Sequence, residues 1–167
     1  MRKIINLLRI KSWIKNGFVI FPALFSDKLM SIDTLLIVFL SFITFSLMSS
    51  VIYVINDIQD LEEDKIHPRK RYRPLPSGEI TVQQAYLLGI SILLLNLFIS
   101  FSFFQSSFLI IIAYFTLNIA YVFKLKHIVL IDCFVIAVNF VLRVIYGSYT
   151  IGVSLSLIHI SEPTRRS

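Results

Sequence analysis

Long apolar runs, separated by short polar segments, make up most of this chain. A helix that crosses a bilayer needs about 20 mostly apolar residues, so the runs predict five transmembrane helices. We expect them at residues 12–29, 34–55, 81–104, 108–123 and 128–151. The first run reaches spanning length only if it begins near Ser12, and Thr81 is a predicted N-cap at the start of the third helix. The pattern therefore predicts an all-α fold, a polytopic transmembrane helical bundle.

The composition also indicates a membrane protein. Apolar residues make up 56% of the chain, charged residues make up 16%, and the mean hydropathy is +0.80. An ordinary soluble domain has about 25% charged residues. The chain is therefore expected to be an integral, multi-pass membrane protein with membrane lipid as a partner.

Basic residues are distributed unevenly along the chain. Five lie within residues 2–15, one lies at position 28, five lie within 65–73, none lies in 105–107, and two lie within 124–126. The positive-inside rule then predicts that the N-terminus and the loops at 56–78 and 124–127 are cytoplasmic. The net charge of +6 does not indicate a nucleic-acid partner, because the bases flank apolar runs and no recognised binding motif is present.

The segment NDIQDLEEDKIHPRKRYRPLPSG, at residues 56–78, is the charged island between apolar runs. Its residues Asp57, Asp60 and Asp64 are spaced i, i+3 and i+7, so a continuous helix would carry all three carboxylates on one face. Such a face repels itself unless a cation binds. Oxygen ligands without a nearby Cys or His cluster favour Mg²⁺, which often shares its coordination with substrate phosphates.

A basic run follows the acidic residues at once, and its members are Lys65, Arg69, Lys70, Arg71 and Arg73. Acidic residues beside bases suit diphosphate chemistry, in which a metal and Arg side chains share the phosphate oxygens. The alternative is a solvated loop whose charges set the orientation of the protein, but orientation needs only bases. His67 is expected to be structural or close to a phosphate, because no second His lies at the spacing of a metal ligand.

The charged segment resembles the first aspartate-rich motif of the UbiA-type intramembrane prenyltransferases, NDxxDxxxD, followed by RPLPSG. Its HPRKRYRP portion is most similar to the decaprenyl-phosphate phosphoribosyltransferase branch. The resemblance implies that the chain holds the N-terminal five helices of a nine-helix fold, in which a second acidic motif faces the first. It also implies Mg²⁺ as the cofactor, a bacterial plasma membrane, and a metal set of Asp57, Asp60 and Asp64.

Two further segments resemble the same family. RIKSWIKN, at residues 9–16, resembles the opening segment, and DCFVIAVNFVLRVIYG, at 132–147, resembles the span whose polar residues line the cavity. The candidate substrate-binding residues are Lys15, Asn16, Asn56, Lys70, Arg71, Arg73, Lys124, Asp132 and Arg143. Each has an alternative: interface anchoring for the N-terminal pair, positive-inside charge for Lys124, a helix-start acid for Asp132, and a structural partner of a helix outside this chain for Arg143.

The resemblance implies a membrane transferase. Its branch implies phosphoribosyl transfer from phosphoribosyl diphosphate to polyprenyl phosphate. The alternative within the family is prenyl transfer from a polyprenyl diphosphate to an aromatic or isoprenoid acceptor. The non-enzymatic alternative is a transporter or scaffold, in which ionisable residues would gather near the bilayer midplane rather than at one face.

Residues 155–165, LSLIHISEPTR, resemble a translated sequencing adapter. We therefore expect residues 1–154 to be the N-terminal part of a UbiA-type domain and 155–167 to be a non-native tail. On this interpretation the chain is a fragment and is itself inactive. Its five helices would leave Arg143, and with it Asp132, without packing partners.

Overall fold

The computed structural model describes residues 2–26, 31–125 and 128–152, and every regular element in these ranges is helical. The elements are α1 (Arg2–Leu7), η1 (Ile10–Val19), α2 (Phe21–Leu24), α3 (Ile32–Gln59), α4 (Leu61–Ile66), η3 (Lys70–Tyr72), α5 (Val82–Phe103), α6 (Gln105–Ala120), η4 (Tyr121–Leu125) and α7 (Val129–Ile151). Among them, α3, α5, α6 with η4, and α7 are long and apolar enough to cross a membrane. The all-α, multi-pass prediction is confirmed. The predicted tail, 155–167, lies outside the described residues.

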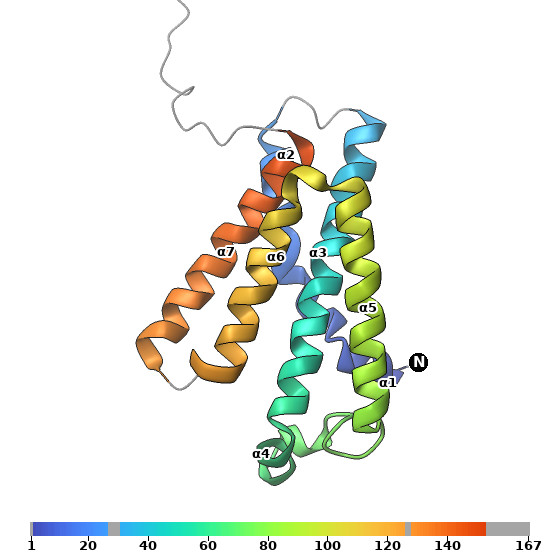
Figure 1. Cartoon of the computed structure of the whole chain (residues 1–167), viewed down its shortest axis with the longest axis vertical. Coiled ribbons are helices and arrows are strands. Elements are labelled where there is room, and N and C mark those ends of the chain that lie inside the picture. The colour runs from blue at the N-terminus through green and yellow to red at the C-terminus, as the bar shows by residue number, and fades with distance from the viewer. Residues whose placement is uncertain (1, 27–30, 126–127, 153–167) are drawn as a thin grey trace, which may run out of the picture.

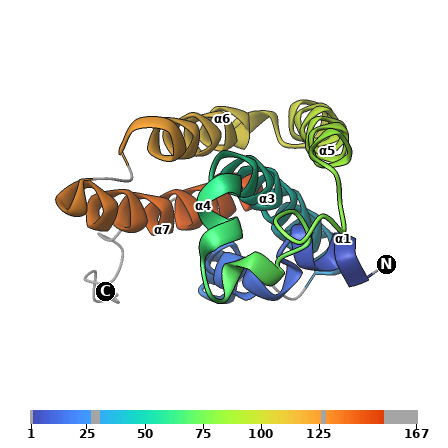
Figure 2. The ribbon, with the colours of Figure 1, turned by 90° about the horizontal axis from the view of Figure 1, so that it is seen from below.

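The helix α3 is the centre of the bundle. Of its most apolar stretch 56% is buried, compared with 17%, 28% and 22% for the corresponding stretches of α5, α6 and α7. Seen from the end that carries α4, α5 and α6 form one layer, α3 and α7 form the next, and the N-terminal segment lies beyond α3 (Figure 2). Side chains on α3 therefore meet both the N-terminal segment and the later helices.

The helix ends follow local capping chemistry. The predicted N-cap Thr81 accepts a hydrogen bond from the backbone N–H of Gln84, whose side chain in turn accepts from the backbone of Thr81, which completes a capping box. The predicted helices at 81–104 and 108–123 leave residues 105–107 as a turn, which is wrong, because α6 already begins at Gln105 and Phe104 alone separates α5 from α6.

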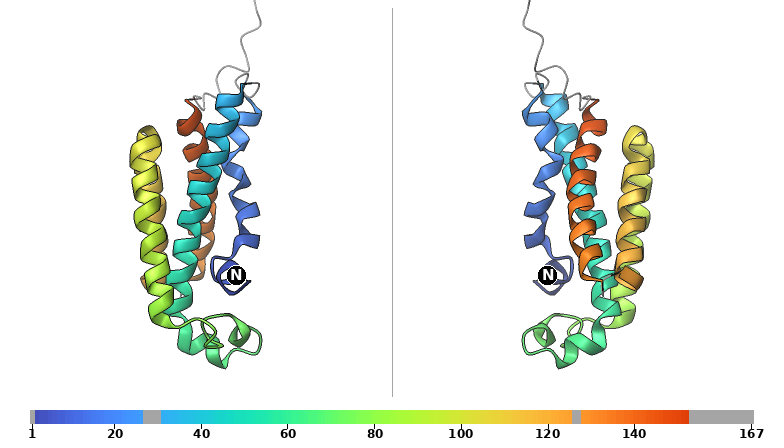
Figure 3. Two further views of the ribbon diagram at one scale, coloured as in Figure 1. Left: turned by 90° about the vertical axis from the view of Figure 1, so that its right-hand side faces the viewer. Right: turned by 90° about the vertical axis from the view of Figure 1, so that its left-hand side faces the viewer.

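The first predicted transmembrane helix is not a continuous α-helix. Residues Ile10–Val19 form a 3₁₀-helix, η1, and Phe21–Leu24 form the single turn α2 with a proline in its first turn; residues 27–30 lie outside the described part. The segment still runs from the α1 end of the bundle to the other end, alongside α3 (Figures 1 and 3). The hydropathy pattern therefore predicted where this segment lies but not that it forms a 3₁₀-helix.

Hydrogen bonds to α3 explain why a ten-residue 3₁₀-helix persists, although such runs rarely exceed about four residues. The indole N–H of Trp13 donates to Ser50 at 2.9 Å, and the amide of Asn16 donates to Ser46 at 3.1 Å. Three residues of a 3₁₀-helix rise about 6 Å, as do four residues of an α-helix. The three-residue period of η1 therefore matches the four-residue period of the antiparallel α3.

A glycine on α7 allows η1 to approach on its other side. A Cβ added at Gly147 would lie 2.0 Å from the backbone oxygen of Val19 and 2.9 Å from its carbonyl carbon. Small residues permit this kind of close approach between helices in membranes. Thus η1 is held between α3 and α7 by backbone proximity on one side and side-chain hydrogen bonds on the other.

We expect Gly147→Ala to destabilise the protein by about 1–3 kcal/mol, the usual cost of overpacking, because the added methyl group meets backbone rather than a movable side chain. The measurement is thermal unfolding in detergent. Gly17→Ala is the control, since a Cβ there would meet nothing within 4 Å. Equal losses of stability in the two variants would contradict the close approach.

The three base-rich segments meet at one end of the bundle. The helix α1, the α4 loop, η4 and the start of α7 all lie at the same end, whereas α2 and the junction between α5 and α6 lie at the other (Figures 1 and 3). This arrangement agrees with the alternation of bases in the sequence.

Candidate functional site

Two buried carboxylates converge where α3 ends. Asp57, on the last turn of α3, is 2% exposed, and Asp64, on α4, is 0% exposed. The same guanidinium nitrogen, Nη1 of Arg73, donates to Asp57 Oδ1 at 3.2 Å and to Asp64 Oδ2 at 2.6 Å. One cationic nitrogen therefore bridges two acids that stand seven residues apart in sequence.

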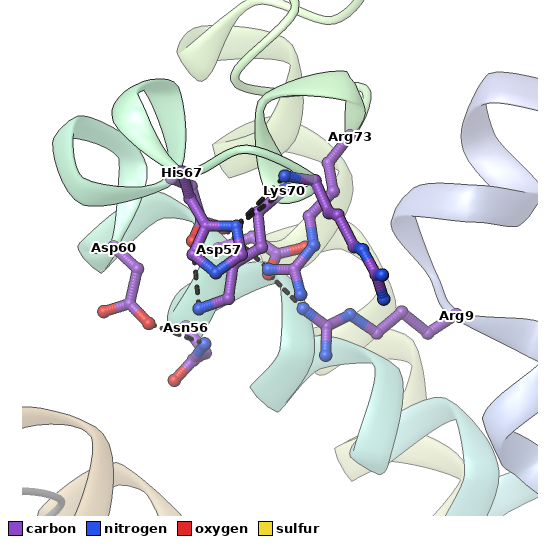
Figure 4. A network of polar contacts seen from close by, with 9 residues as sticks. Arg9, Asn56, Asp57, Asp60, His67, Lys70 and Arg73 are labelled. Carbon is purple, nitrogen blue, oxygen red and sulfur yellow. Dashed lines mark hydrogen bonds and ion pairs between the residues drawn. The ribbon is translucent and has the colours of Figure 1, made fainter.

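Two further cations complete the cluster. Arg9 Nη2 donates to Asp57 Oδ1, and Lys70 Nζ forms an ion pair with Asp64 Oδ1 at 3.3 Å, although that oxygen has no hydrogen-bond partner of good geometry. Figure 4 shows Arg9 reaching the site from the N-terminal segment, opposite the loop that supplies Lys70 and Arg73. Three bases thus surround two acids, so the carboxylates are compensated without a metal.

Local backbone structure places these bases. Arg9 has a left-handed conformation, φ 49° and ψ 46°, between α1 and η1, which is uncommon for a residue with a Cβ and often marks a functional position. His67 Nδ1 accepts from the backbone N–H groups of Arg69 and Lys70, both at 3.2 Å. His67 therefore shapes the turn of the loop, as expected for a structural residue.

The prediction that all three aspartates share one helical face is wrong. The helix α3 ends at Gln59, and Asp60 is the residue between α3 and α4. The amide of Asn56 donates to Asp60 Oδ2 at 3.1 Å, and Asp60 lies away from the cluster (Figure 4). The chain bends at Asp60 while the backbone N–H of Asp64 still donates to its carbonyl at 2.8 Å. The bend brings Asp64 towards Asp57 and leaves Asp60 outside.

The pair Asp57 and Asp64 fits a magnesium ion better than the predicted trio does. No group of three or more His, Cys, Asp or Glu side chains is arranged as a metal site within the described residues. Mg²⁺, however, is often held by one or two carboxylates together with waters and substrate phosphates. Arg73 Nη1 occupies the position between the two carboxylates that a cation would take. These two residues could hold the ion, and Asp60 could not join them without a change in the bend.

A cleft of about 350 Å³ opens beside the cluster. Its charged lining residues are Arg9, Lys11, Asp57, Arg69 and Arg73. Four bases face one acid there, and Arg side chains in particular bind phosphate oxygens with paired N–H groups. The cleft is therefore suited to a polyanion that brings or shares a metal at the carboxylates.

A second polar pocket, of about 300 Å³, lies deeper between η1, α3, α6 and α7. Lys15 and Arg143 are its basic residues. Arg143 is 8% exposed and donates through Nε to Asn16 Oδ1 at 3.0 Å and through Nη1 to the backbone carbonyl of Asn139 at 2.8 Å. The expectation that Arg143 lacks partners within this chain is therefore wrong. Asp132 also has a partner, since it accepts from the hydroxyl of Tyr121 at 2.6 Å.

The other predicted residues lie outside these two pockets. Arg71 is exposed and donates to the hydroxyl of Tyr72 at 2.5 Å, and Lys124 is exposed in η4. The basic cleft residues absent from the predicted substrate-binding set are Arg9, Lys11 and Arg69, of which Arg69 was recognised only as a member of the basic run. Arg9 opens the RIKSWIKN segment, so a signal was present, but nothing in its spacing connects it with Asp57, 48 positions later.

Comparison with known proteins agrees with the geometry. The profile of the UbiA prenyltransferase family matches residues 18–161, which is well over half of the chain. The chain belongs to the UbiA prenyltransferase family. The resemblance of its aspartate segment to this family is thereby confirmed. Membership of a transferase family favours an enzyme over the transporter or scaffold alternative.

UbiA-family relatives with assigned activities match most of the chain. The decaprenyl-phosphate phosphoribosyltransferase of Corynebacterium glutamicum is 33% identical over 91% of this chain and 47% of the relative. The digeranylgeranylglyceryl phosphate synthase of Sulfolobus acidocaldarius is 35% identical over 68% of this chain and 41% of the relative. A solved structure of a digeranylgeranylglyceryl phosphate synthase superposes with a TM-score of 0.78 at 26% identity, over 90% of this chain and 54% of that chain. The chain spans about half the length of these relatives.

Proposed function

We propose that this chain provides the metal- and diphosphate-binding face of a membrane transferase that moves a phosphoribosyl group from phosphoribosyl diphosphate to a polyprenyl phosphate. The convergence of Asp57 and Asp64 on one nitrogen of Arg73, at the edge of an Arg-rich cleft, supports the proposal. A cation held by two carboxylates beside a basic cleft suits a donor that carries a diphosphate.

The residues of the cleft would act on the leaving group. Asp57 and Asp64 would hold Mg²⁺, which neutralises the charge that grows on diphosphate as it departs. Arg73 would then be released from the carboxylates to bind phosphate oxygens with Arg9 and Arg69. These side chains orient the donor and stabilise negative charge, which are interactions that strengthen in the transition state.

The transfer needs no general base from the protein. An oxygen of the polyprenyl phosphate attacks the anomeric carbon of the donor, the new C–O bond forms, and the bond from that carbon to diphosphate breaks with its electron pair on the diphosphate. A phosphate monoester is already largely dianionic near neutral pH, so the attacking oxygen carries no proton that must be removed.

Prenyl transfer is the second candidate function. It is favoured by the likeness to a digeranylgeranylglyceryl phosphate synthase, at a TM-score of 0.78. The same carboxylates and bases would then hold a prenyl diphosphate and promote its ionisation. Identity of 33% to a phosphoribosyltransferase over 91% of the chain favours phosphoribosyl diphosphate as the donor.

Calorimetric titration of the purified chain in detergent tests the donor. We expect phosphoribosyl diphosphate to bind in the presence of Mg²⁺ and to bind at least about 10-fold more weakly in excess chelator or in Asp64→Asn, the effect of losing one charged hydrogen-bonding group. Glu62→Gln is the matched control, because Glu62 is also on α4 but its side chain is 82% exposed.

The outcomes separate the candidates. Binding of geranylgeranyl diphosphate but not of phosphoribosyl diphosphate would favour prenyl transfer, and unchanged affinity in Asp64→Asn would remove the metal-site proposal. Our expectation that this chain alone does not catalyse the transfer stays a prediction. Sustained release of diphosphate from the same samples, supplied with polyprenyl phosphate, would contradict it.

We also propose that the α4 end of the bundle faces the cytoplasm, where phosphoribosyl diphosphate is available. The distribution of bases supports this orientation. In a Cys133→Ser background, a cysteine introduced by the substitution Ser77→Cys, in the exposed loop before α5, should resist an impermeant thiol reagent in intact cells and react after lysis. Labelling of this cysteine in intact cells would show that the α4 end faces the outside, and would contradict the proposed orientation.

A further inference from the structure

The pocket between η1, α3, α6 and α7 has positive charge without a matching acid. Lys15 and Arg143 line it, and none of its other lining residues is Asp or Glu. This composition differs from that of the cleft beside α4, where Asp57 accompanies the bases. Because two cations and no carboxylate line this pocket, its electrostatics favour an anion.

Arg143 is the main reason to regard this pocket as a binding site. It is more than nine-tenths buried, and both hydrogen bonds that the structure gives it end on uncharged oxygens, of Asn16 and Asn139. In the part of the chain that the structure describes, no carboxylate pairs with it. An unpaired ion in a membrane interior is costly and is characteristic of a functional site.

The surroundings fix Arg143 without neutralising it. The rings of Phe45, Tyr114 and Phe140 have centroids 5.4–5.7 Å from its guanidinium carbon, and such contacts are weakly attractive. Asn16, on η1, also donates to the hydroxyl of Ser46 and accepts from that of Ser49. These hydrogen bonds to α3 fix the side chain that accepts from Nε of Arg143. The guanidinium is thus preorganised, and its charge remains available to a ligand.

The pocket lies close to the carboxylate cleft along α3. Tyr53 lines the pocket one turn before Asp57, and its ring lies 4.8 Å from the guanidinium carbon of Arg9. Ser49, which also lines the pocket, precedes Asp57 by eight residues, or about 12 Å of helix. The pocket and the carboxylate cleft therefore lie within about two turns of α3 of each other, and Tyr53 lies on α3 between Ser49 and Asp57.

We propose that the pocket of Lys15 and Arg143 is a second anion site, which binds a phosphate monoester separately from the diphosphate bound at Asp57 and Asp64. The assignment of the second anion to a reactant rests on the proposed function, in which one ligand carries a diphosphate and both carry a monoester. The monoester is the head group of a polyprenyl phosphate or the 5-phosphate of the phosphoribosyl donor. Apolar wall residues, Ile136 and Phe140 among them, also suit a prenyl chain.

The natural tryptophan offers a direct test, because Trp13 is the single tryptophan of the chain and donates to Ser50, next to Ser49 of the pocket. In detergent and excess chelator, farnesyl phosphate should change Trp13 fluorescence and bind at least about 10-fold more tightly than uncharged farnesol, the effect of one charge-assisted contact. Ribose 5-phosphate is the soluble probe. Competition by ribose 5-phosphate without tighter binding of farnesyl phosphate would identify the donor as the source of the monoester.

Variants decide whether the pocket is the site. Arg143→Gln should weaken the preferred probe about 10- to 100-fold, and Arg143→Lys should restore part of the affinity. Lys15→Gln, at an exposed position that the fold tolerates, should weaken it several-fold and serves if Arg143→Gln does not fold. Asp64→Asn should leave monoester binding unchanged, which separates this site from the metal site. Equal binding of farnesyl phosphate and farnesol together with no binding of ribose 5-phosphate, or full affinity in folded Arg143→Gln and Lys15→Gln, would overturn the proposal.

Discussion

Replacing Arg73 with methionine should lower the stability of the metal-free protein by about 3 kcal/mol. This is the lower end of the cost of removing one partner from a buried ion pair, chosen because the side chain of Arg73 is 30% exposed. The variant leaves Asp57 and Asp64 facing each other, with Arg9 and Lys70 as the remaining bases. Chemical unfolding in detergent, with and without excess chelator, measures the effect.

Magnesium should rescue this variant. If a cation belongs between the carboxylates, millimolar Mg²⁺ will raise the unfolding temperature of Arg73→Met more than that of the unchanged protein, in which Arg73 already occupies the position. Arg71→Met is the matched control, because Arg71 lies in the same loop but contacts Tyr72. Equal losses of stability in the two variants, or no selective rescue by Mg²⁺, would contradict the inference that Arg73 occupies the position of a metal ion.

Asn16→Leu should be similarly damaging, with an expected loss of about 3–5 kcal/mol. Asn16 is 2% exposed, donates to Ser46, and accepts from Arg143. Leucine has the same branched arrangement of side-chain heavy atoms, although its methyl groups are larger, so we expect the loss to come mainly from a buried guanidinium without its acceptor. Unfolding in detergent again provides the measurement.

Two comparisons isolate that cause. Asn96→Leu removes another buried amide, which donates to the backbone oxygen of Thr44 at 2.6 Å, but it leaves no charge unpaired and should cost only about 0.6–2 kcal/mol. Adding Arg143→Met to Asn16→Leu should recover much of the loss, because an apolar pair can replace a buried polar one. A double variant no more stable than Asn16→Leu would show that packing, rather than charge, decides.

Hydropathy and local chemistry were enough to predict much of this fold. The positions of α3, α5 and α7 follow from apolar runs, and the start of α5 follows from Thr81, because these signals act within a few residues of the chain. The charge pattern of residues 56–78 likewise indicated where carboxylates and bases would meet.

Interactions between distant residues account for what the sequence did not predict. The bend at Asp60 interrupts a segment without Gly or Pro, and the ion pairs of Asp57 and Asp64 with Arg9 and Arg73 favour the bent form over a straight helix. Arg143 has its acceptor, Asn16, 127 positions away. Residue spacing and hydrophobic periodicity do not reveal such long-range contacts. These contacts nevertheless determine which residues belong to the site.

The 3₁₀-helix η1 has a consequence for the biosynthesis of the protein in the membrane. The elements that hold it, α3 and α7, are both synthesised after it, and a short 3₁₀-helix that carries Lys11 and Lys15 gains little by entering lipid alone. We therefore expect η1, although it is synthesised before α3 and α7, to reach its final position after both of them. We expect it to remain at the membrane surface until α7 has inserted and Gly147 is available for the backbone contact. Assembly of the site, which needs Arg9 and Asn16, is thereby coupled to completion of the bundle.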